Sequence, residues 1–296
     1  MGIAREIPVI TRLCKLALFG AVVMGSPIAT RAQAPVPAAQ MTDSPCPAPS
    51  PGPPREMLDA ILKPGAKPPP MPAAGDERLR EYLKKHAEDL ARDFPDLCRY
   101  KSDNAAILKG AHPSAVFMGD SITEGWGAGD PSLFTQGVVD RGISGQTSPQ
   151  MVVRFYQDVV ALRPQAVHIM AGTNDVAGNT GPNSPDDFKN NIRAMVDLAM
   201  ANHIRVILAS IPPAERFPWK PDIQPVEQIR RLNAWLRQFA DQHKLIYADY
   251  YTSLTTPSGA FRPELSNDGV HPNSDGYAAM RPIADAALRK AMHGSP

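Results

Sequence analysis

The chain has 296 residues, a formal net charge of +1 and a pI near 7.8. This near-neutral charge excludes a protein that binds nucleic acid or an acidic membrane surface through a strong basic field. The length accommodates one α/β domain of ordinary size together with tails.

Residues 1–34 have the layout of a secretory signal peptide. Basic residues come first, residues 16–23 are apolar, and Ala32-Gln33-Ala34 is a small-residue cleavage site. The alternative is an uncleaved membrane anchor, but the apolar stretch is shorter than the about 20 residues that a span needs. We therefore expect a secreted or periplasmic protein, with no stable membrane span once the signal is cleaved.

Residues 35–75 form a linker rich in proline, with sequences such as PCPAPSPGPP and KPGAKPPPMP. This composition is typical of an extended tether rather than a packed core. From residue 76 to about residue 97, apolar residues recur at helical spacing between charged ones, which predicts an amphipathic helix packed on the domain. The predicted organisation is thus a signal peptide over 1–34, a linker over 35–75 and one domain over 76–296.

The chain contains three cysteines, of which Cys14 is lost with the signal peptide. The two that remain in an exported chain, Cys46 and Cys98, indicate one disulfide. Such a bond would tie the proline-rich linker to the domain. The sequence leaves open the alternative of two unpaired thiols, because it does not show that the two residues meet.

Beyond the first predicted helix, short apolar runs alternate with amphipathic stretches, which predicts a parallel sheet with helices on both faces. Ligands bind such sheets at the carboxyl ends of the strands, where the strand order reverses. The loops that follow the strands are therefore where chemistry is expected. The expected strands cover residues 115–118, 138–140, 166–170, 205–210 and 245–248, and the expected helices lie near residues 148–162, 186–202, 224–243 and 273–292.

Ser121 directly follows the first of these strands, in the sequence FMGDSITEGW. A serine hydroxyl becomes a nucleophile when a neighbouring base removes its proton. The alternative is that Ser121 only caps a helix that begins near Thr123. The serine by itself does not decide between the two.

Asp268 and His271 lie three residues apart in the sequence DGVHP, in the loop before the last helix. This spacing allows the carboxylate to reach one imidazole nitrogen while the other faces outward, which fixes the tautomer and stabilises the imidazolium. A surface pair and a metal site are the alternatives. The sequence offers no second cluster of metal-ligating residues, so neither a metal nor a cofactor is expected.

Acyl-transfer chemistry also needs hydrogen-bond donors aimed at the charge that develops in the transition state. Gly145 leaves its backbone N–H open to close approach, and Asn174 offers a side-chain amide. The N–H of Ser121 is a third possible donor. Gly145 and Asn174 also have a plainer interpretation, as residues that favour turns.

Four sequence blocks, which carry Ser121, Gly145, Asn174 and the Asp268–His271 pair in this order, resemble the SGNH branch of the GDSL hydrolase superfamily. The resemblance covers roughly residues 112–292, with GDSI in place of GDSL as one small departure. It implies the SGNH hydrolase fold, a flavodoxin-like three-layer α/β sandwich with a five-stranded parallel sheet.

The resemblance also implies roles for these residues. Ser121 would be the nucleophile of a catalytic triad completed by Asp268 and His271. The oxyanion hole would consist of Ser121, Gly145 and Asn174. An α/β-hydrolase is disfavoured, because its nucleophile elbow reads Gly-x-Ser-x-Gly and a threonine takes the place of the second glycine here.

Further side chains adjoin these positions. We expect Asp120 and Asp175 to hold their loops through backbone N–H groups rather than to take part in chemistry. Trp126, Phe217 and Trp219 lie on loops that should face the site, where they would line an acyl or sugar pocket. The alternative is that these three aromatic side chains only cover the edge of the sheet.

The resulting hypothesis is a secreted serine esterase that acts through an acyl-enzyme. Short loops rich in Gly, Asn and Pro favour a small-molecule or glycan ester as the substrate. The reaction would remove a short, acetyl-like group from a polar or carbohydrate alcohol. A lysophospholipase or thioesterase that acts on lipid acyl groups is the main alternative, since members of the resembled superfamily do these reactions. A non-catalytic carbohydrate-binding protein is a further alternative, which the intact set of residues disfavours.

Overall fold

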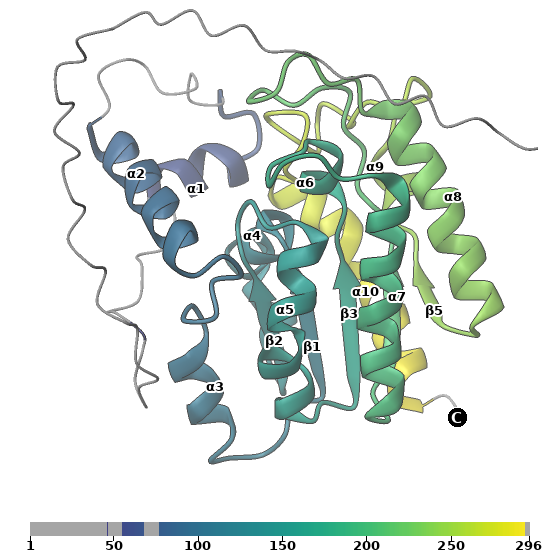
Figure 1. The fold of residues 1–296 in the computed structure, drawn as a ribbon. Helices are drawn as coiled ribbons and strands as arrows, with labels where there is room; N and C mark the ends of the chain where they lie inside the picture. Colours follow the sequence, from purple (N-terminus) through teal and green to yellow (C-terminus); the bar gives the residue numbers. More distant parts are fainter. Residues whose placement is uncertain (1–45, 47–54, 68–76, 294–296) are drawn as a thin grey trace, which may run out of the picture. The chain divides into compact units, whose positions relative to one another are not determined.

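The computed structural model of the chain describes residues 46, 55–67 and 77–293 (Figure 1). These residues fall within one compact unit, Cys46–Pro296. The predicted signal peptide over residues 1–34 lies outside the described residues, as do Cys14 and most of the predicted linker.

Within the described residues, five parallel strands form one sheet in the order β2-β1-β3-β4-β5. The α/β fold class that the sequence predicted is confirmed, as is the five-stranded parallel sheet that the resemblance implied, and the strand order is flavodoxin-like. β1 lies between β2 and β3, so the strand order reverses at β1. The strands are β1 (Ala115–Gly119), β2 (Val138–Gly142), β3 (Ala166–Met170), β4 (Arg205–Ala209) and β5 (Ile246–Ala248).

Helices connect these strands and close the fold, and several begin at the capping residues that their sequences supply. At the start of α7, for example, the Ser184 hydroxyl accepts from the N–H of Asp187, while the Asp187 carboxylate accepts from the N–H of Ser184. The helices that carry or flank the sheet are α4 (Ser121–Gly129), α5 (Ser148–Asp158), α6 (Thr173–Val176), α7 (Pro185–Ala201), α8 (Val226–Gln242), α9 (Tyr250–Leu254) and α10 (Ser274–His293). Short 3₁₀ segments occur at Pro131–Phe134 and Val160–Leu162.

The two faces of the sheet bury two separate apolar cores. On one face, alternate residues of β1, β3 and β4 pack against α5, α7 and α8. On the other face, the intervening residues of the same strands pack against α4, α9 and α10. Figure 1 shows α5 and α7 in front of the sheet and α10 behind it. This three-layer packing buries all five residues of both β1 and β3, as is typical of central parallel strands.

Residues 55–62 form helix α1 (Arg55–Leu62), inside the stretch for which the sequence predicted an extended tether. That part of the prediction is wrong. The segment REMLDAIL contains no proline and is amphipathic, and its Leu62 is buried in the core beside α4 and α10. The side-chain amide of Asn267 contacts the α1 carbonyl oxygens of Ala60 and Ile61, each at 2.9 Å, and that of Lys63 at 2.8 Å. These contacts satisfy carbonyls that a helix end leaves without intrahelical partners.

The remaining N-terminal elements are α2 (Glu77–Arg92) and α3 (Lys101–Ile107). The helix predicted over residues 76–97 is therefore present but ends at Arg92. The predicted disulfide between Cys46 and Cys98 is also present, with a Cα–Cα distance of 5.4 Å. None of the helices in the described ranges combines the length and the apolar composition that crossing a bilayer requires.

Candidate active site

The residues singled out from the sequence meet at the carboxyl edge of the sheet. Ser121 follows β1, Gly145 follows β2 and Asn174 follows β3, so the three neighbouring strands at the reversal of strand order each contribute one residue. The loop before α10 brings Asp268 and His271 to the same place. This is where a doubly wound sheet offers a binding crevice.

The turn from β1 into α4 is tight because it contains Gly119. A Cβ atom at Gly119 would lie only 1.9 Å from the hydroxyl oxygen of Thr123, so no larger residue fits there. The residue that caps α4 is Asp120, whose Oδ1 accepts from the N–H of Ile122 at 3.0 Å. Ser121 is therefore the first residue of the helix and not its cap. Its hydroxyl is left available, and its N–H lies at the positive end of the helix.

Ser121, His271 and Asp268 form an unbroken series of hydrogen bonds. The Oγ atom of Ser121 lies 3.0 Å from Nε2 of His271, and Nδ1 of His271 lies 2.7 Å from Oδ2 of Asp268. The other carboxylate oxygen of Asp268 accepts from the N–H groups of Val270 and His271, each at 2.8 Å. The carboxylate is thus held by its own loop and orients the imidazole. Its contact makes Nδ1 the protonated nitrogen and leaves Nε2 free to accept a proton from Ser121.

The electrostatics of this pair favour a charged imidazole opposite a charged carboxylate. Burial lowers the pKa of His271, but the charge and hydrogen bond of Asp268 raise it, and the net direction is upward from the ordinary value. Burial raises the pKa of Asp268, but His271 and the backbone N–H groups outweigh it and hold that pKa well below the usual range. The arrangement therefore stabilises the imidazolium that forms when His271 takes a proton.

Asn174 lies in α6, with its side chain directed back toward the Ser121 turn. Its Nδ2 atom donates to Oδ2 of Asp120 at 3.2 Å and to the carbonyl oxygen of Gln146 at 3.1 Å. Gly145, directly before Gln146, has a φ of +78° and stays partly exposed, in a turn that few other residues adopt without strain. The amide of Asn174, the N–H of Gly145 and the N–H of Ser121 are thus positioned by neighbouring loops at one sheet edge.

Asp120 and Asp175 hold these loops, as the sequence predicted. Asp120 links the Ser121 turn to Asn174 through its two carboxylate oxygens. Asp175 accepts from both the N–H and the hydroxyl of Ser148 and so fastens the loop that follows β2. Burial raises the pKa of Asp120 to about 6 and also raises that of Asp175.

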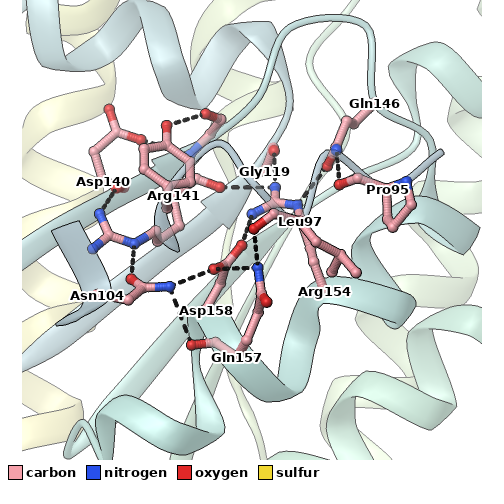
Figure 2. A network of polar contacts seen from close by, with 12 residues as sticks. Pro95, Leu97, Asn104, Gly119, Asp140, Arg141, Gln146, Arg154, Gln157 and Asp158 are labelled. Carbon is pink, nitrogen blue, oxygen red and sulfur yellow. Dashed lines mark hydrogen bonds and ion pairs between the residues drawn. The ribbon is translucent and has the colours of Figure 1, made fainter. Parts of the chain in front are cut away.

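A buried arginine on α5, which the sequence analysis missed, contacts the ends of the same loops. Arg154 on α5 is fully buried and donates to the carbonyl oxygens of Gly119 at 3.0 Å and Arg141 at 2.8 Å, as Figure 2 shows. Its other nitrogens contact Oε1 of Gln146 at 2.5 Å and Oδ2 of Asp158 at 3.1 Å. Arg154 therefore ties the ends of β1 and β2 to the residue whose carbonyl contacts Asn174.

The N-terminal segment is fastened to the same helix and loop. Three glutamine side chains donate to its backbone carbonyls: Gln146 to Pro95 at 2.8 Å, Gln150 to Phe94 at 2.6 Å and Gln157 to Leu97 at 2.7 Å. Part of this network appears in Figure 2. No local pattern in the sequence signals these partners, because each pair is more than 50 residues apart.

The structure corrects two of the three aromatic residues that the sequence placed in a substrate pocket. Trp126 is fully buried in the core, where it packs against the rings of Tyr250 and Tyr277. Phe217 is equally buried, and its ring centroid lies 5.3 Å from that of Trp219. Trp219 alone of the three is partly exposed, with its ring centroid 6.3 Å from that of His271. Trp126 and Phe217 are therefore packing residues, and Trp219 is the aromatic side chain beside the site.

Comparison with known proteins agrees with this geometry. Residues 117–279 match the model of the GDSL-like Lipase/Acylhydrolase family. A solved structure from Bacteroides fragilis, described as an acylhydrolase, is 42% identical and superposes with a TM-score of 0.65, over 68% of this chain and 99% of that one. A GDSL-like lipase from Bacteroides thetaiotaomicron is 43% identical, with a TM-score of 0.64, over 67% of this chain and 99% of that one. A search of curated proteins gave no significant match.

Proposed function

Because the chain belongs to the GDSL-like lipase/acylhydrolase family, a family of carboxylic ester hydrolases, we propose that it is an exported serine esterase that removes short acyl groups from polar alcohols. The observation that carries the proposal is the hydrogen-bonded series from Asp268 through His271 to Ser121, beside three donors at one sheet edge. In this proposal Ser121 is the nucleophile, His271 the general base and acid, and Asp268 the group that orients His271.

The first half of the reaction forms an acyl-enzyme. Nε2 of His271 takes the proton of Ser121 as the serine oxygen attacks the ester carbonyl carbon. The carbonyl oxygen becomes an oxyanion, which accepts from the N–H groups of Ser121 and Gly145 and from the amide of Asn174. The bond to the alcohol oxygen then breaks, and the imidazolium of His271 gives its proton to the departing alcohol.

The second half returns the enzyme to its starting state. Water takes the place of the alcohol. His271 removes a proton from this water, and the resulting hydroxide attacks the carbonyl carbon of the acyl-enzyme. The bond to Ser121 breaks as His271 returns the proton to the serine oxygen. The Nε2–Oγ distance of 3.0 Å lies within the range that direct proton transfer requires.

The surroundings of Ser121 support a short acyl group. Of the three aromatic side chains expected to build a pocket, only Trp219 is partly exposed next to His271. One flat ring suits an acetyl group or the face of a sugar, whereas a long acyl chain needs a larger apolar surface to bury. A lipid acyl ester remains the second candidate, since one of the relatives is described as a GDSL-like lipase.

Export is supported by the signal-like composition of residues 1–34 and by the Cys46–Cys98 disulfide, a bond that persists in oxidising compartments. In the mature protein we expect a chain that begins near Pro35 and carries this bond. Intact mass measured with and without reductant tests both expectations. Two alkylatable thiols in the unreduced, exported protein would contradict the disulfide.

The substrate class is tested with the acetate, butyrate and octanoate esters of 4-nitrophenol. We expect kcat/KM to decrease from acetate to octanoate, and Ser121→Ala to lower turnover of every ester by at least about 10³-fold. A preference for octanoate would favour the lipid alternative. If Ser121→Ala kept more than a few per cent of the activity in a clean preparation, Ser121 would not be the nucleophile.

A further inference from the structure

A series of side-chain hydrogen bonds leads from the rim of the site to the amide of Asn174. The indole N–H of Trp219 donates to Oδ1 of Asn179 at 3.0 Å. Nδ2 of Asn179 donates to Oδ1 of Asn174 at 2.6 Å. Nδ2 of Asn174 then donates to the carbonyl oxygen of Gln146 at 3.1 Å and to Oδ2 of Asp120 at 3.2 Å.

The groups at the two ends of this series, the indole N–H of Trp219 and the backbone carbonyl of Gln146, allow only one donor-to-acceptor direction along it. An indole N–H only donates, so the side of Asn179 that faces Trp219 must be its carbonyl oxygen. The NH₂ group of Asn179 then faces Asn174, which must present its own carbonyl oxygen in return. At the far end, the backbone carbonyl of Gln146 only accepts, so it too requires the NH₂ group of Asn174 on that side.

We propose that Asn179 is a positioning residue for the oxyanion hole, and that Trp219 fixes its orientation. This inference rests on the proposed esterase function. If the Asn174 side-chain amide rotated so that its oxygen and its NH₂ group exchanged places, it would present a carbonyl oxygen to the developing oxyanion and repel it. Asn179 opposes this rotation, together with Gln146 and Asp120, because its NH₂ group donates to the Asn174 oxygen and would face an NH₂ group if the amide rotated.

The hydrogen bonds of Asn174 show why its amide needs a further contact that fixes its orientation. Both hydrogens of its NH₂ group already have acceptors, Gln146 and Asp120. An oxyanion therefore draws one of these hydrogens away from a contact of 3.1 or 3.2 Å while the rest of the amide must stay in place. The 2.6 Å contact with Asn179 is the shortest that the Asn174 side chain makes among the described residues.

Trp219 also connects this series to the substrate. Its ring lies beside His271, with ring centroids 6.3 Å apart, and also contacts the buried ring of Phe217. An acyl or alcohol group that packs on the ring therefore contacts the residue whose N–H orients Asn179. Because Asn179 is exposed, water competes for its hydrogen bonds, and the expected effects are moderate.

The test measures kcat and KM for 4-nitrophenyl acetate at a pH above the His271 ionisation. We expect Asn179→Ala to lower kcat about 5- to 10-fold and Asn179→Asp about 30-fold or more, both with KM nearly unchanged, because an oxyanion donor acts on the transition state. The larger effect of Asn179→Asp follows from its carboxylate, which places an acceptor against the Asn174 oxygen. Asn190→Asp is a matched control, because it adds the same charge at an exposed residue of α7.

Two further variants show whether Asn179 acts through Asn174. In an Asn174→Ala background, Asn179→Ala should cost less than about twofold in kcat, since no amide is left to orient. Trp219→Phe replaces the indole with a smaller aromatic ring that lacks the N–H. It should lower kcat about two- to fivefold in the parent and by a clearly smaller factor in the Asn179→Ala variant, whereas a change in KM from the smaller ring should be the same in both.

The proposal is overturned if Asn179→Ala lowers kcat equally in both backgrounds, changes only KM, or changes neither. The proposed function is judged separately in the same assay. Turnover by the parent that Ser121→Ala abolishes keeps the esterase assignment intact, whatever the Asn179 variants do.

Discussion

The two halves of the candidate active site are built in different ways. The acid–base half is one loop, in which Asp268 contacts both the imidazole and two backbone N–H groups within three residues of itself. The oxyanion half draws Ser121, Gly145 and Asn174 from the segments that follow three separate strands. The first half is therefore a local structure, whereas the second depends on the packing of the whole sheet edge. Substitutions in the first should change chemistry more than stability, and those in the second should change both.

The largest effect is expected from Asp268→Asn. In the parent, His271 must be neutral to accept a proton, and its pKa is raised, so kcat/KM should fall as the pH decreases through an ionisation above about 6.5. The variant loses the charge that raises this pKa, so its acid limb should move to lower pH. It also favours the wrong tautomer, which should lower the plateau at high pH by about 10⁴-fold.

A pH–rate profile of both proteins on 4-nitrophenyl acetate measures these effects, and thermal unfolding shows whether the fold is retained. If the variant matched the parent above pH about 8, the orienting group for His271 would lie elsewhere.

The next largest effect is expected from Asn174→Ala in the oxyanion half. It should lower kcat by about 10²–10³-fold and leave KM nearly unchanged, because the amide acts on the charge that develops in the transition state. Steady-state kinetics on the acetate ester separate the two parameters. A change in KM alone would assign Asn174 to substrate binding.

Arg154→Met tests whether the oxyanion half depends on the buried network. The substitution leaves the Asp158 carboxylate without its buried cationic partner, so the free energy of unfolding should fall by about 3–5 kcal/mol. The matched control is Arg231→Met, which removes an exposed pair on α8 and should change stability by less than about 1 kcal/mol. Urea unfolding measures both, and equal losses would mean that the network under Gly119 and Gln146 does not stabilise this edge.

The smallest effect is expected from Asn267→Ala, next to the acid–base loop. The side chain of Asn267 holds the end of α1, and its loss should lower the free energy of unfolding by about 1 kcal/mol. Because Asp268 is held by its own loop, kcat should change by less than about threefold. A loss of kcat comparable to that of Asn174→Ala would show that the acid–base half is not self-contained.

The features that were predicted best from the sequence are those that depend on residues close together along the chain. The strands and the Asp268–His271 contact were predictable because hydrophobic runs and a three-residue spacing determine them locally. The position of Trp126 was misjudged, although Ile122 lies four residues earlier on the same helix face and signals a buried stripe. The tether prediction failed at α1 because the contacts that hold it come from Asn267, more than 200 residues later.

The buried network could not be predicted for the same reason. Arg154 reads as one more charged residue of an amphipathic helix, and only the fold shows that it points inward to Gly119 and Gln146. Asn179 likewise gives no signal, since its role depends on a tryptophan 40 residues away.

The central claim is that Ser121 becomes acylated with His271 as its base. Rapid acid quenching of the enzyme during turnover of 4-nitrophenyl acetate, followed by intact-mass and peptide analysis, tests it most directly. We expect a mass increase of one acetyl group, located on the peptide that contains Ser121, and no such increase in the Ser121→Ala or His271→Ala variants. An acetyl group on another residue, or turnover by the parent without any acetylated protein, would contradict the account.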